Sequence, residues 1–534
     1  MKNLRILLLL LGIFSITYQK TLPLFSEGTE VVIESENIGD AEENGTPKNP
    51  TLLQVSARPW LYLLSERKGK TIKSFKQIPD DVFADIQTKG FDYLWVMGVW
   101  SIGQEGIKHD RTTQSLVDGY KKILPDYKEA DAIGCPYAIT QYTCNPELCP
   151  GGDDDLTWLR NKLKSYNIKL MLDFVPNHSA HDSPWVKSNP TYYIRKPSGD
   201  AADSSRYFSD GIAFGNMQYS SAWTDVAQLN YWDSGLRTHM TNQLLKIAKY
   251  ADGIRCDMAY IILNDYFGTT WSKELKAYSY SKPSKEFWTS AISSVKSKYP
   301  NTIFLAEVYG DYYTTLIDTG FDYTYDKTLL DRFHSEHLDN IRDWITHTKS
   351  QKQHMCRFLE NHDDNRAVEH FGNSVTKANA AALATYTLPG LRFFFQDQWL
   401  GFQNKLDVHL RRAKSESQKS EAVNLYNKLF PIITDPTIKN GEWTYLTVSG
   451  NDAWRLMAWK WKNSSTSKKM LIVCNFSNTK AGGSVVVSDV SGSGNITIKE
   501  LLSGTSYTRS ASEMKSSGLN VVVDAWSAQY FSYS

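Results

Sequence analysis

Short apolar runs recur along residues 57–430 and alternate with amphipathic stretches of helix length. Runs that are apolar at nearly every position are typical of parallel strands covered by helices on both faces of their sheet. The clear runs are Tyr93–Trp100, Lys169–Phe174, Gly253–Met258, Thr302–Val308, Phe321–Tyr325, His354–Leu359 and Leu391–Gln396, and a weaker one is Tyr137–Thr140. Eight strands alternating with helices predict an α/β fold, a closed (β/α)8 TIM barrel.

Two segments depart from this alternation. Residues 179–230 follow the third run, are rich in Pro, Gly, Asp, Ser and Tyr, and are too irregular for one crossover helix. They predict a small inserted B domain after strand 3, on the rim where insertions shape substrate clefts. Over residues 431–534, short β-rich runs separated by Gly, Ser and Asn predict a C-terminal antiparallel β-sandwich. A stabilising role and a starch-binding role both stay open for this sandwich.

The N-terminus has the features of an export signal. Lys2 and Arg5 precede the apolar run Ile6–Ile16, which is shorter than the ~20 residues needed to span a bilayer. We therefore expect a signal peptide over residues 1–19 and a secreted protein with no membrane association after cleavage; an uncleaved anchor is the alternative. Residues 20–56 are acidic in their central part, and we expect them to form a flexible leader.

Composition and cysteines narrow the function classes. The 534 residues carry 59 Lys and Arg against 58 Asp and Glu, which argues against a nucleic-acid partner, because such proteins usually show a basic excess. Aromatic residues make up 13% of the chain, as suits a sugar binder or a large aromatic core.

Cys144 and Cys149 are close enough to close a small loop, with Cys135 as a competing partner, and Cys256 is expected to be a buried free thiol. The sequence contains no CxxC pair, which argues against a structural zinc site. It gives no indication of the oligomeric state.

Carboxylates stand at the C-terminal ends of four predicted strands. They are Asp173 in DFVPNH, Asp257 in GIRCDMA, Glu307 in LAEV and Asp363 in FLENHDDNR. In a parallel barrel all of these ends meet on one face, so distant residues converge around one pocket. A charge at the end of a buried strand is costly unless it is paired or functional. One such group alone could be a structural ion pair, but four of them together, beside His178, Arg255 and His362, predict a catalytic site.

These stretches resemble the four signature regions of the α-amylase family of glycoside hydrolases. The matching residues are Asp173, Asn177 and His178 in the first region; Gly253, Arg255 and Asp257 in the second; Glu307, Tyr309 and Gly310 in the third; and Asn361, His362 and Asp363 in the fourth. The resemblance implies a catalytic barrel, an inserted B domain and a C-terminal sandwich, covering about residues 57–534.

The resemblance also implies roles in a retaining, double-displacement mechanism. Asp257 would be the nucleophile, and Glu307 would be the acid that later acts as the base. Asp363 would bind sugar hydroxyls and favour the distorted ring. Substrate contacts would come from Arg255, His178, His362, Tyr137 and Asp173, while Trp100, Trp185 and Trp223 would either line outer subsites or pack in the core.

The function implied is hydrolysis of α-glucosidic bonds, with α-1,4 links of starch-like glucans or maltooligosaccharides as substrate. An α-glucan transglycosylase shares all of this chemistry, and a non-catalytic sugar-binding or partner protein is the rival from another class. The chemistry needs no cofactor. In many relatives Asn177 would help to bind a structural calcium, but Gln228 stands where they carry an acid, so a calcium site stays open.

Overall fold

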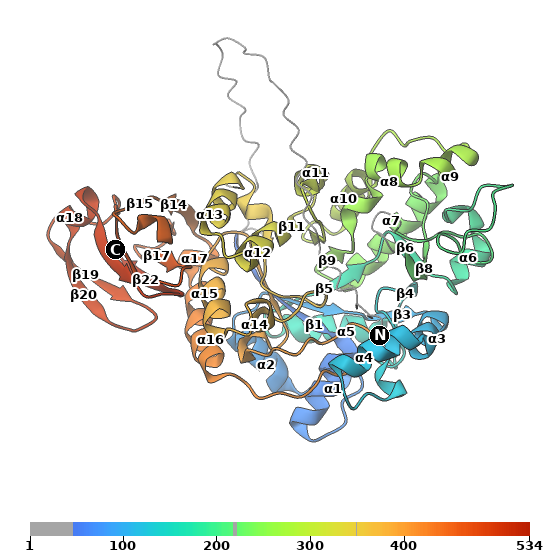
Figure 1. The fold of residues 1–534 in the computed structure, drawn as a ribbon, viewed down its shortest axis with the longest axis horizontal. Coiled ribbons are helices and arrows are strands. Elements are labelled where there is room, and N and C mark those ends of the chain that lie inside the picture. The colour runs from blue at the N-terminus through green and yellow to red at the C-terminus, as the bar shows by residue number, and fades with distance from the viewer. Residues whose placement is uncertain (1–45, 217–221, 349) are drawn as a thin grey trace, which may run out of the picture.

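The computed structural model describes residues 46–216, 222–348 and 350–534. Its centre is a closed barrel with the strand order β1-β13-β12-β11-β10-β9-β5-β2, and every pairing in it is parallel (Figure 1). The barrel strands are β1 Thr51–Ser56, β2 Tyr93–Met97, β5 Lys169–Phe174, β9 Gly253–Cys256, β10 Ile303–Ala306, β11 Tyr323–Tyr325, β12 Met355–Arg357 and β13 Leu391–Phe395. Nearly all of their residues are buried, because side chains fill the interior and helices cover the outside. The predicted (β/α)8 barrel is confirmed.

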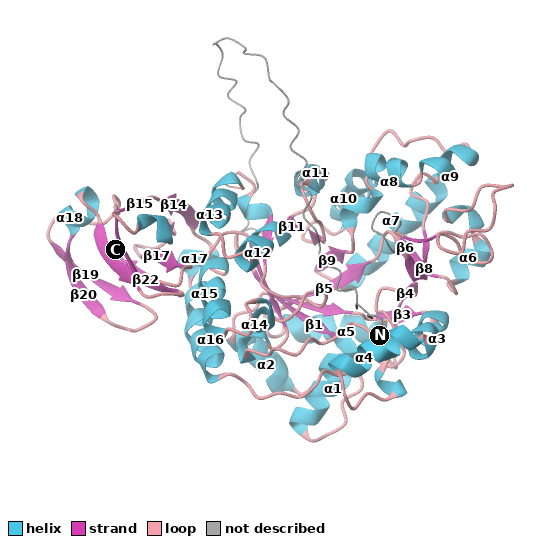
Figure 2. Ribbon diagram, in the orientation of Figure 1, coloured by secondary structure: helices cyan, strands magenta, loops and turns pink. Residues whose placement is uncertain are grey.

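Helices surround the barrel and carry the connections between its strands (Figure 2). The longer ones are α1 Ala57–Lys68, α2 Asp80–Thr88, α3 Gln104–Thr112, α4 Gln114–Ile123, α5 Asp154–Lys164, α7 Ser234–Tyr250, α10 Phe287–Lys298, α12 Lys327–His334, α13 Leu338–His347, α15 Val375–Thr385 and α16 Ser420–Ile433. Local signals set their ends: the Asp233 carboxylate accepts a hydrogen bond from Leu236 N and so caps the start of α7. Helix α1 ends at Gly69, whose φ of +61° is free of strain only for glycine. Within the described residues, every helix is too short or too polar to cross a bilayer.

Strand β1 corrects the prediction of a flexible leader over residues 20–56. Residues 51–56 form a buried strand that pairs with β13 and β2. The expected barrel strand at Tyr137–Thr140 is wrong in turn, because β4 Ile139–Cys144 pairs antiparallel with β3 Trp100–Ile102 outside the barrel. The sequence did not predict β1, because polar Thr51 and Gln54 interrupt its apolar run. The expected signal peptide and the leader as far as residue 45 lie outside the described residues.

The segment after the third barrel strand forms a small separate sheet. Its strands are β6 His178–Ala180, β7 Phe214–Gly215 and β8 Trp223–Gln228, with β8 in the middle, and helix α6 Pro184–Ser188 lies between β6 and β7 in the chain. Both pairings in this sheet are antiparallel. β6 begins shortly after β5 ends, so the sheet stands at the C-terminal rim of the barrel, as the predicted insertion requires.

The C-terminal strands form two antiparallel sheets that share an apolar core, at the left of Figure 2. The larger sheet contains β14 Glu442–Leu446, β16 Leu456–Lys462, β17 Lys469–Asn475, β19 Asn495–Glu500, β20 Ser506–Ser510 and β22 Ser527–Tyr533; the smaller contains β15 Val448–Ser449, β18 Ala481–Val485 and β21 Leu519–Val523. The predicted sandwich is therefore present. Its expected start at residue 431 falls inside α16, whose last turn includes Pro431, so the strands begin later.

The described residues contain one disulfide, which decides between the pairings left open by the sequence. Cys144 and Cys149 form a disulfide that closes a short loop after β4. Cys135 is a free thiol, which removes the competing pairing, and Cys256 is a buried free thiol as expected.

Candidate active site

The strand register places two carboxylates side by side at the rim. β9 and β10 pair in parallel with Cys256 opposite Ala306, and Asp257 and Glu307 are the residues that follow each of them. Neighbouring strands lie roughly 4.8 Å apart, so these two carboxyl groups leave adjacent positions of the ring. Both residues are buried, at 6% and 3% exposure.

Arg255 joins the two carboxylates. Its Nη1 lies 2.8 Å from Asp257 Oδ1 and its Nη2 lies 2.9 Å from Glu307 Oε2. The guanidinium is fully buried, so its charge is poorly screened and acts strongly on both groups. Burial, and then the charge of Glu307, raise the pKa of Asp257 well above its ordinary value, while Arg255 opposes that rise.

The chain after Asp257 turns sharply and holds Glu307 in place. Met258 adopts a φ of +40°, which is costly for a residue with a side chain, and its N–H donates to Glu307 Oε2 at 2.7 Å. The Tyr309 hydroxyl donates to the other oxygen, Oε1, at 2.8 Å. Glu307 is therefore fixed from both sides before any substrate arrives.

Asp363 faces the open side of the same site. Its side chain is 49% exposed and its Oδ2 lies 3.0 Å from Nε2 of His362, a buried residue. Partial desolvation would raise the pKa of Asp363, but His362, Arg255 and Lys405 together outweigh it, and the net direction is downward. The Asn361 side-chain oxygen accepts from the backbone N–H of Asp363 at 2.8 Å and shapes this turn.

His362 is positioned by partners from distant parts of the chain, one in a loop and one in strand β1. The Tyr137 hydroxyl lies 3.1 Å from its Nε2, and the Gln54 amide lies 2.7 Å from its Nδ1. The Arg255 guanidinium lies over the Tyr137 ring, 5.3 Å from its centre. Tyr137 therefore contacts both His362 and the arginine that joins the two buried carboxylates. The predicted residues Tyr137, Arg255 and His362 thus come together.

Asp173 is buried and lies beside Arg255. In the β5–β9 register it is opposite Arg255, whose Nη1 is 3.9 Å from Asp173 Oδ1. Oδ1 also accepts from Trp95 Nε1 at 3.1 Å, and Oδ2 accepts from Gly98 N at 3.3 Å. Asp173 is thus placed beside Arg255, and its predicted sugar contact stays a prediction.

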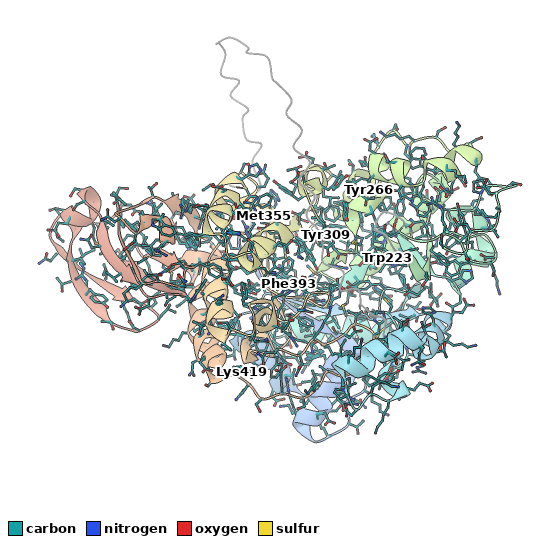
Figure 3. All side chains as sticks on the ribbon, in the orientation of Figure 1. Trp223, Tyr266, Tyr309, Met355, Phe393 and Lys419 are labelled. Atoms are coloured by element: carbon teal, nitrogen blue, oxygen red, sulfur yellow. A yellow bond between two sulfur atoms is a disulfide. The ribbon has the colours of Figure 1, made fainter. Side chains whose placement is uncertain are left out.

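His178 lies at the junction of the barrel and the inserted sheet. It is 4% exposed, its Nδ1 is 3.3 Å from the Asn177 amide, and its ring packs edge-on against Trp223 at 5.3 Å. Burial lowers the pKa of His178 to about 3, so the imidazole is neutral at ordinary pH. Figure 3 shows Trp223, from the inserted sheet, and Tyr309, from the loop after β10, toward the middle of the molecule.

Sequence reasoning missed the polar members of barrel strands. Gln54 and Trp95 lie in β1 and β2 and contact His362 and Asp173, but the sequence of a barrel strand does not show which of its side chains reach these residues. Of the three tryptophans left open, Trp100 is buried and donates from Nε1 to the Asp173 carbonyl, and Trp185 is buried beside Tyr142. Trp223 alone is half-buried, next to His178.

The residues around Asn177 do not fit calcium. The Gln228 side-chain amide donates to both the Asn177 side-chain oxygen, at 2.9 Å, and the Asn177 carbonyl, at 3.0 Å. An amide nitrogen therefore occupies the place where a cation would need to meet these oxygens. Among the described residues no group of three acidic, histidine or cysteine side chains is arranged to hold a metal ion.

Comparisons with known proteins agree with this geometry. A family model described as "Alpha amylase, catalytic domain" matches residues 123–470. Alpha-amylase 3 of Dictyoglomus thermophilum is 25% identical over 318 residues, covering 54% of this chain and 58% of that protein. An alpha-amylase of Niallia circulans is also 25% identical, over 54% of this chain and 56% of its own length. The chain thus spans little more than half of these two relatives.

Solved structures show the same fold over most of the chain. A maltogenic alpha-amylase, AmyB of Thermotoga neapolitana, superposes with a TM-score of 0.65 at 19% identity, covering 91% of this chain and 99% of that one. An alpha-amylase of Geobacillus thermoleovorans, complexed with acarbose, gives a TM-score of 0.64 at 16% identity, over 92% and 99%. With the family model matching well over half of its length, the chain belongs to the α-amylase family of glycoside hydrolases.

Proposed function

We propose that this protein is a retaining α-glycosidase that cleaves α-1,4 bonds of starch-like glucans or maltooligosaccharides. The observation that carries the proposal is the single buried guanidinium of Arg255 in contact with both Asp257 and Glu307. Retaining glycosidases need their two carboxyl groups only about 5–5.5 Å apart, because one attacks the sugar carbon directly. Neighbouring strand ends joined by one planar group support that separation.

The two carboxylates divide the work between them. Asp257 attacks the anomeric carbon while Glu307 gives a proton to the leaving oxygen, and a covalent glycosyl-enzyme forms. Glu307 then takes a proton from water, which displaces Asp257. Arg255 orients Asp257 and stabilises its carboxylate during both steps.

The surrounding residues bind the sugar ring. Asp363 is half-exposed and hydrogen-bonded to His362, so it can accept hydrogen bonds from two hydroxyls of one ring. The Tyr137 ring offers a flat face for stacking. His178, being neutral, can both donate and accept. Asp173 serves by holding Arg255 from below.

Hydrolysis and transglycosylation are separated by product analysis. With maltooligosaccharides of one defined length, we expect only shorter products, released first as the α-anomer. Chromatographic sizing and NMR of the anomeric proton make the measurement. Products longer than the substrate would favour the transglycosylase alternative, and a β-anomer would contradict the retaining mechanism. A maltosyltransferase of Rhodospirillum rubrum, 24% identical over 238 residues, makes the alternative worth this test.

We also propose that the protein is exported. The basic residues Lys2 and Arg5 before the apolar run Ile6–Ile16 support this. The Cys144–Cys149 disulfide supports it independently, since such bonds persist in oxidising compartments.

Gln228 takes over the role that calcium has in many relatives. It is fully buried, and besides its two bonds to Asn177 it donates to the Leu229 carbonyl at 3.0 Å. These bonds tie the inserted sheet to the end of β5. We expect a chelator to leave the melting temperature unchanged, and Gln228→Ala to lower the stability by about 2–4 kcal/mol, because buried oxygens lose their donor.

The matched variant is Gln228→Glu. Its carboxylate would face the two Asn177 oxygens, so calcium should raise the melting temperature of this variant and not that of the parent. Differential scanning calorimetry with and without calcium makes the comparison. A parent protein that loses stability in chelator would contradict the role given to Gln228.

A further inference from the structure

A basic cavity lies on the same rim of the barrel as the candidate active site, over a different group of strands. It has a volume of about 380 Å³ and is lined by residues of three loops, including Arg58, Arg111 and Arg411. Arg58 follows β1 and Arg411 follows β13, while Ser101 and Ile102 of β3 follow β2. Since β13, β1 and β2 are neighbours in the ring, their C-terminal loops meet at one place. In Figure 1 the helices of these loops, α1, α3 and α4, lie in the lower part of the view.

The cavity holds more positive than negative charge. Three arginines line it, and Glu147 is its single acidic lining residue. Glu147 Oε1 lies 3.2 Å from Arg411 Nη1, so the one carboxylate of the lining is already paired with an arginine. A second cavity, of about 530 Å³, shares Arg58, Glu147 and Arg411 and adds Lys70 and Lys73 against one further acid, Glu66.

The arginines are held in place by backbone oxygens. Arg58 Nη1 donates to the Ile133 carbonyl at 2.7 Å, and Arg111 Nε donates to the Ala132 carbonyl at 3.0 Å. These contacts fix the side chains without neutralising them. Burial lowers the pKa of Arg58 to about 10, with Glu147 opposing and Arg411 adding to the effect, so a further anion would relieve this crowding of positive charge.

A disulfide and a backbone hydrogen bond restrain two parts of the cavity lining. Glu147 lies within the loop closed by the Cys144–Cys149 disulfide, and Asn145 and Pro146 of that loop are also lining residues. Ile133, another lining residue, is held by the hydrogen bond from its backbone N–H to the His409 carbonyl, at 2.8 Å. Preorganised donors bind an anion without a large ordering cost.

We propose that this cavity is a binding site for an oxyanion, a phosphate or sulfate group. Guanidinium groups match the geometry of such anions and form charge-assisted hydrogen bonds with them. The group could arrive as an ester on a sugar or as the free ion. Arg58 bonds to Ile133, only a short segment before Tyr137, so a bound anion would steady the loop that carries this active-site residue.

Calorimetric titration tests the proposal with inorganic phosphate, inorganic sulfate, glucose 6-phosphate and glucose, at constant ionic strength. We expect phosphate to bind the parent protein, Arg411→Gln to weaken binding roughly tenfold or more, and Glu147→Gln to tighten it roughly threefold or more. Arg509→Gln, an exposed arginine in β20, is the control and should change nothing. The two lining variants shift the affinity in opposite directions, which general loss of folding cannot do.

The arms of the titration identify the source of the anion. Tighter binding of glucose 6-phosphate than of phosphate indicates a sugar ester, and equal or weaker binding indicates the free ion. Absence of binding by phosphate, sulfate and glucose 6-phosphate overturns the proposal, as does an affinity that Arg411→Gln and Glu147→Gln leave unchanged. Because the readout is binding, its result is separate from the fate of the proposed catalytic function.

Discussion

Asp257→Asn should reduce kcat on maltooligosaccharides by roughly four orders of magnitude or more, because the amide cannot form the glycosyl-enzyme. The substitution keeps the size of the side chain and an oxygen that can still accept from Arg255, so the fold should persist. Steady-state kinetics and near-ultraviolet circular dichroism make the two measurements.

The control for this variant is Asp339→Asn, an exposed aspartate on α13 whose side chain is 83% exposed. It should leave kcat within experimental error. A loss of only ~10-fold from Asp257→Asn would mean that another group is the nucleophile.

Glu307→Gln should cost about 10²–10⁴-fold in kcat on natural substrates, because the leaving sugar then departs without a proton. The same variant should form its glycosyl-enzyme readily from α-glucosyl fluoride, since fluoride is a good leaving group and needs no acid. Release of fluoride, followed with an ion-selective electrode, measures this step. If the rate falls equally on both kinds of substrate, Glu307 is not the proton donor and its proposed role is wrong.

The local fixing of Glu307 explains why this pair of substitutions is informative. Tyr309 and Met258 both donate to its carboxylate, and a glutamine oxygen can accept one of these bonds. Arg255 contacts both carboxylates, and Asp173 and Trp95 lie against its guanidinium. The two variants therefore share Arg255 as a partner, but only Glu307→Gln also disturbs the bonds from Tyr309 and Met258.

The barrel and the gathering of carboxylates at its rim were predictable because each rests on a strong local pattern. Continuous apolar runs such as Lys169–Phe174 identify buried parallel strands, and carboxylates at or shortly after the ends of four of them mark the rim. The convergence of Asp257, Glu307 and Asp363 followed from topology alone. Their contacts with Arg255 and His362 then supplied the geometry.

Other features could not be predicted, for identifiable physical reasons. β1 carries Gln54 in an otherwise apolar run, and this residue faces His362 inside the barrel, a contact made across more than 300 residues of chain. β4 has a strand-like pattern, but its partner is β3 and not the barrel, and pairing is a tertiary property. The bonds from the Gln228 amide to Asn177 could not be predicted, since only distances show that its nitrogen meets both Asn177 oxygens.

Identification of the covalent intermediate is the sharpest test of Asp257 as the nucleophile of a retaining mechanism. The protein is incubated with 5-fluoro-α-glucosyl fluoride, which forms a glycosyl-enzyme that breaks down slowly, and the digest is analysed by mass spectrometry. We expect one added fluoroglucosyl group, on the carboxylate of Asp257. A label on a different residue, or an unlabelled enzyme that inverts the anomeric centre of maltooligosaccharides, would contradict it.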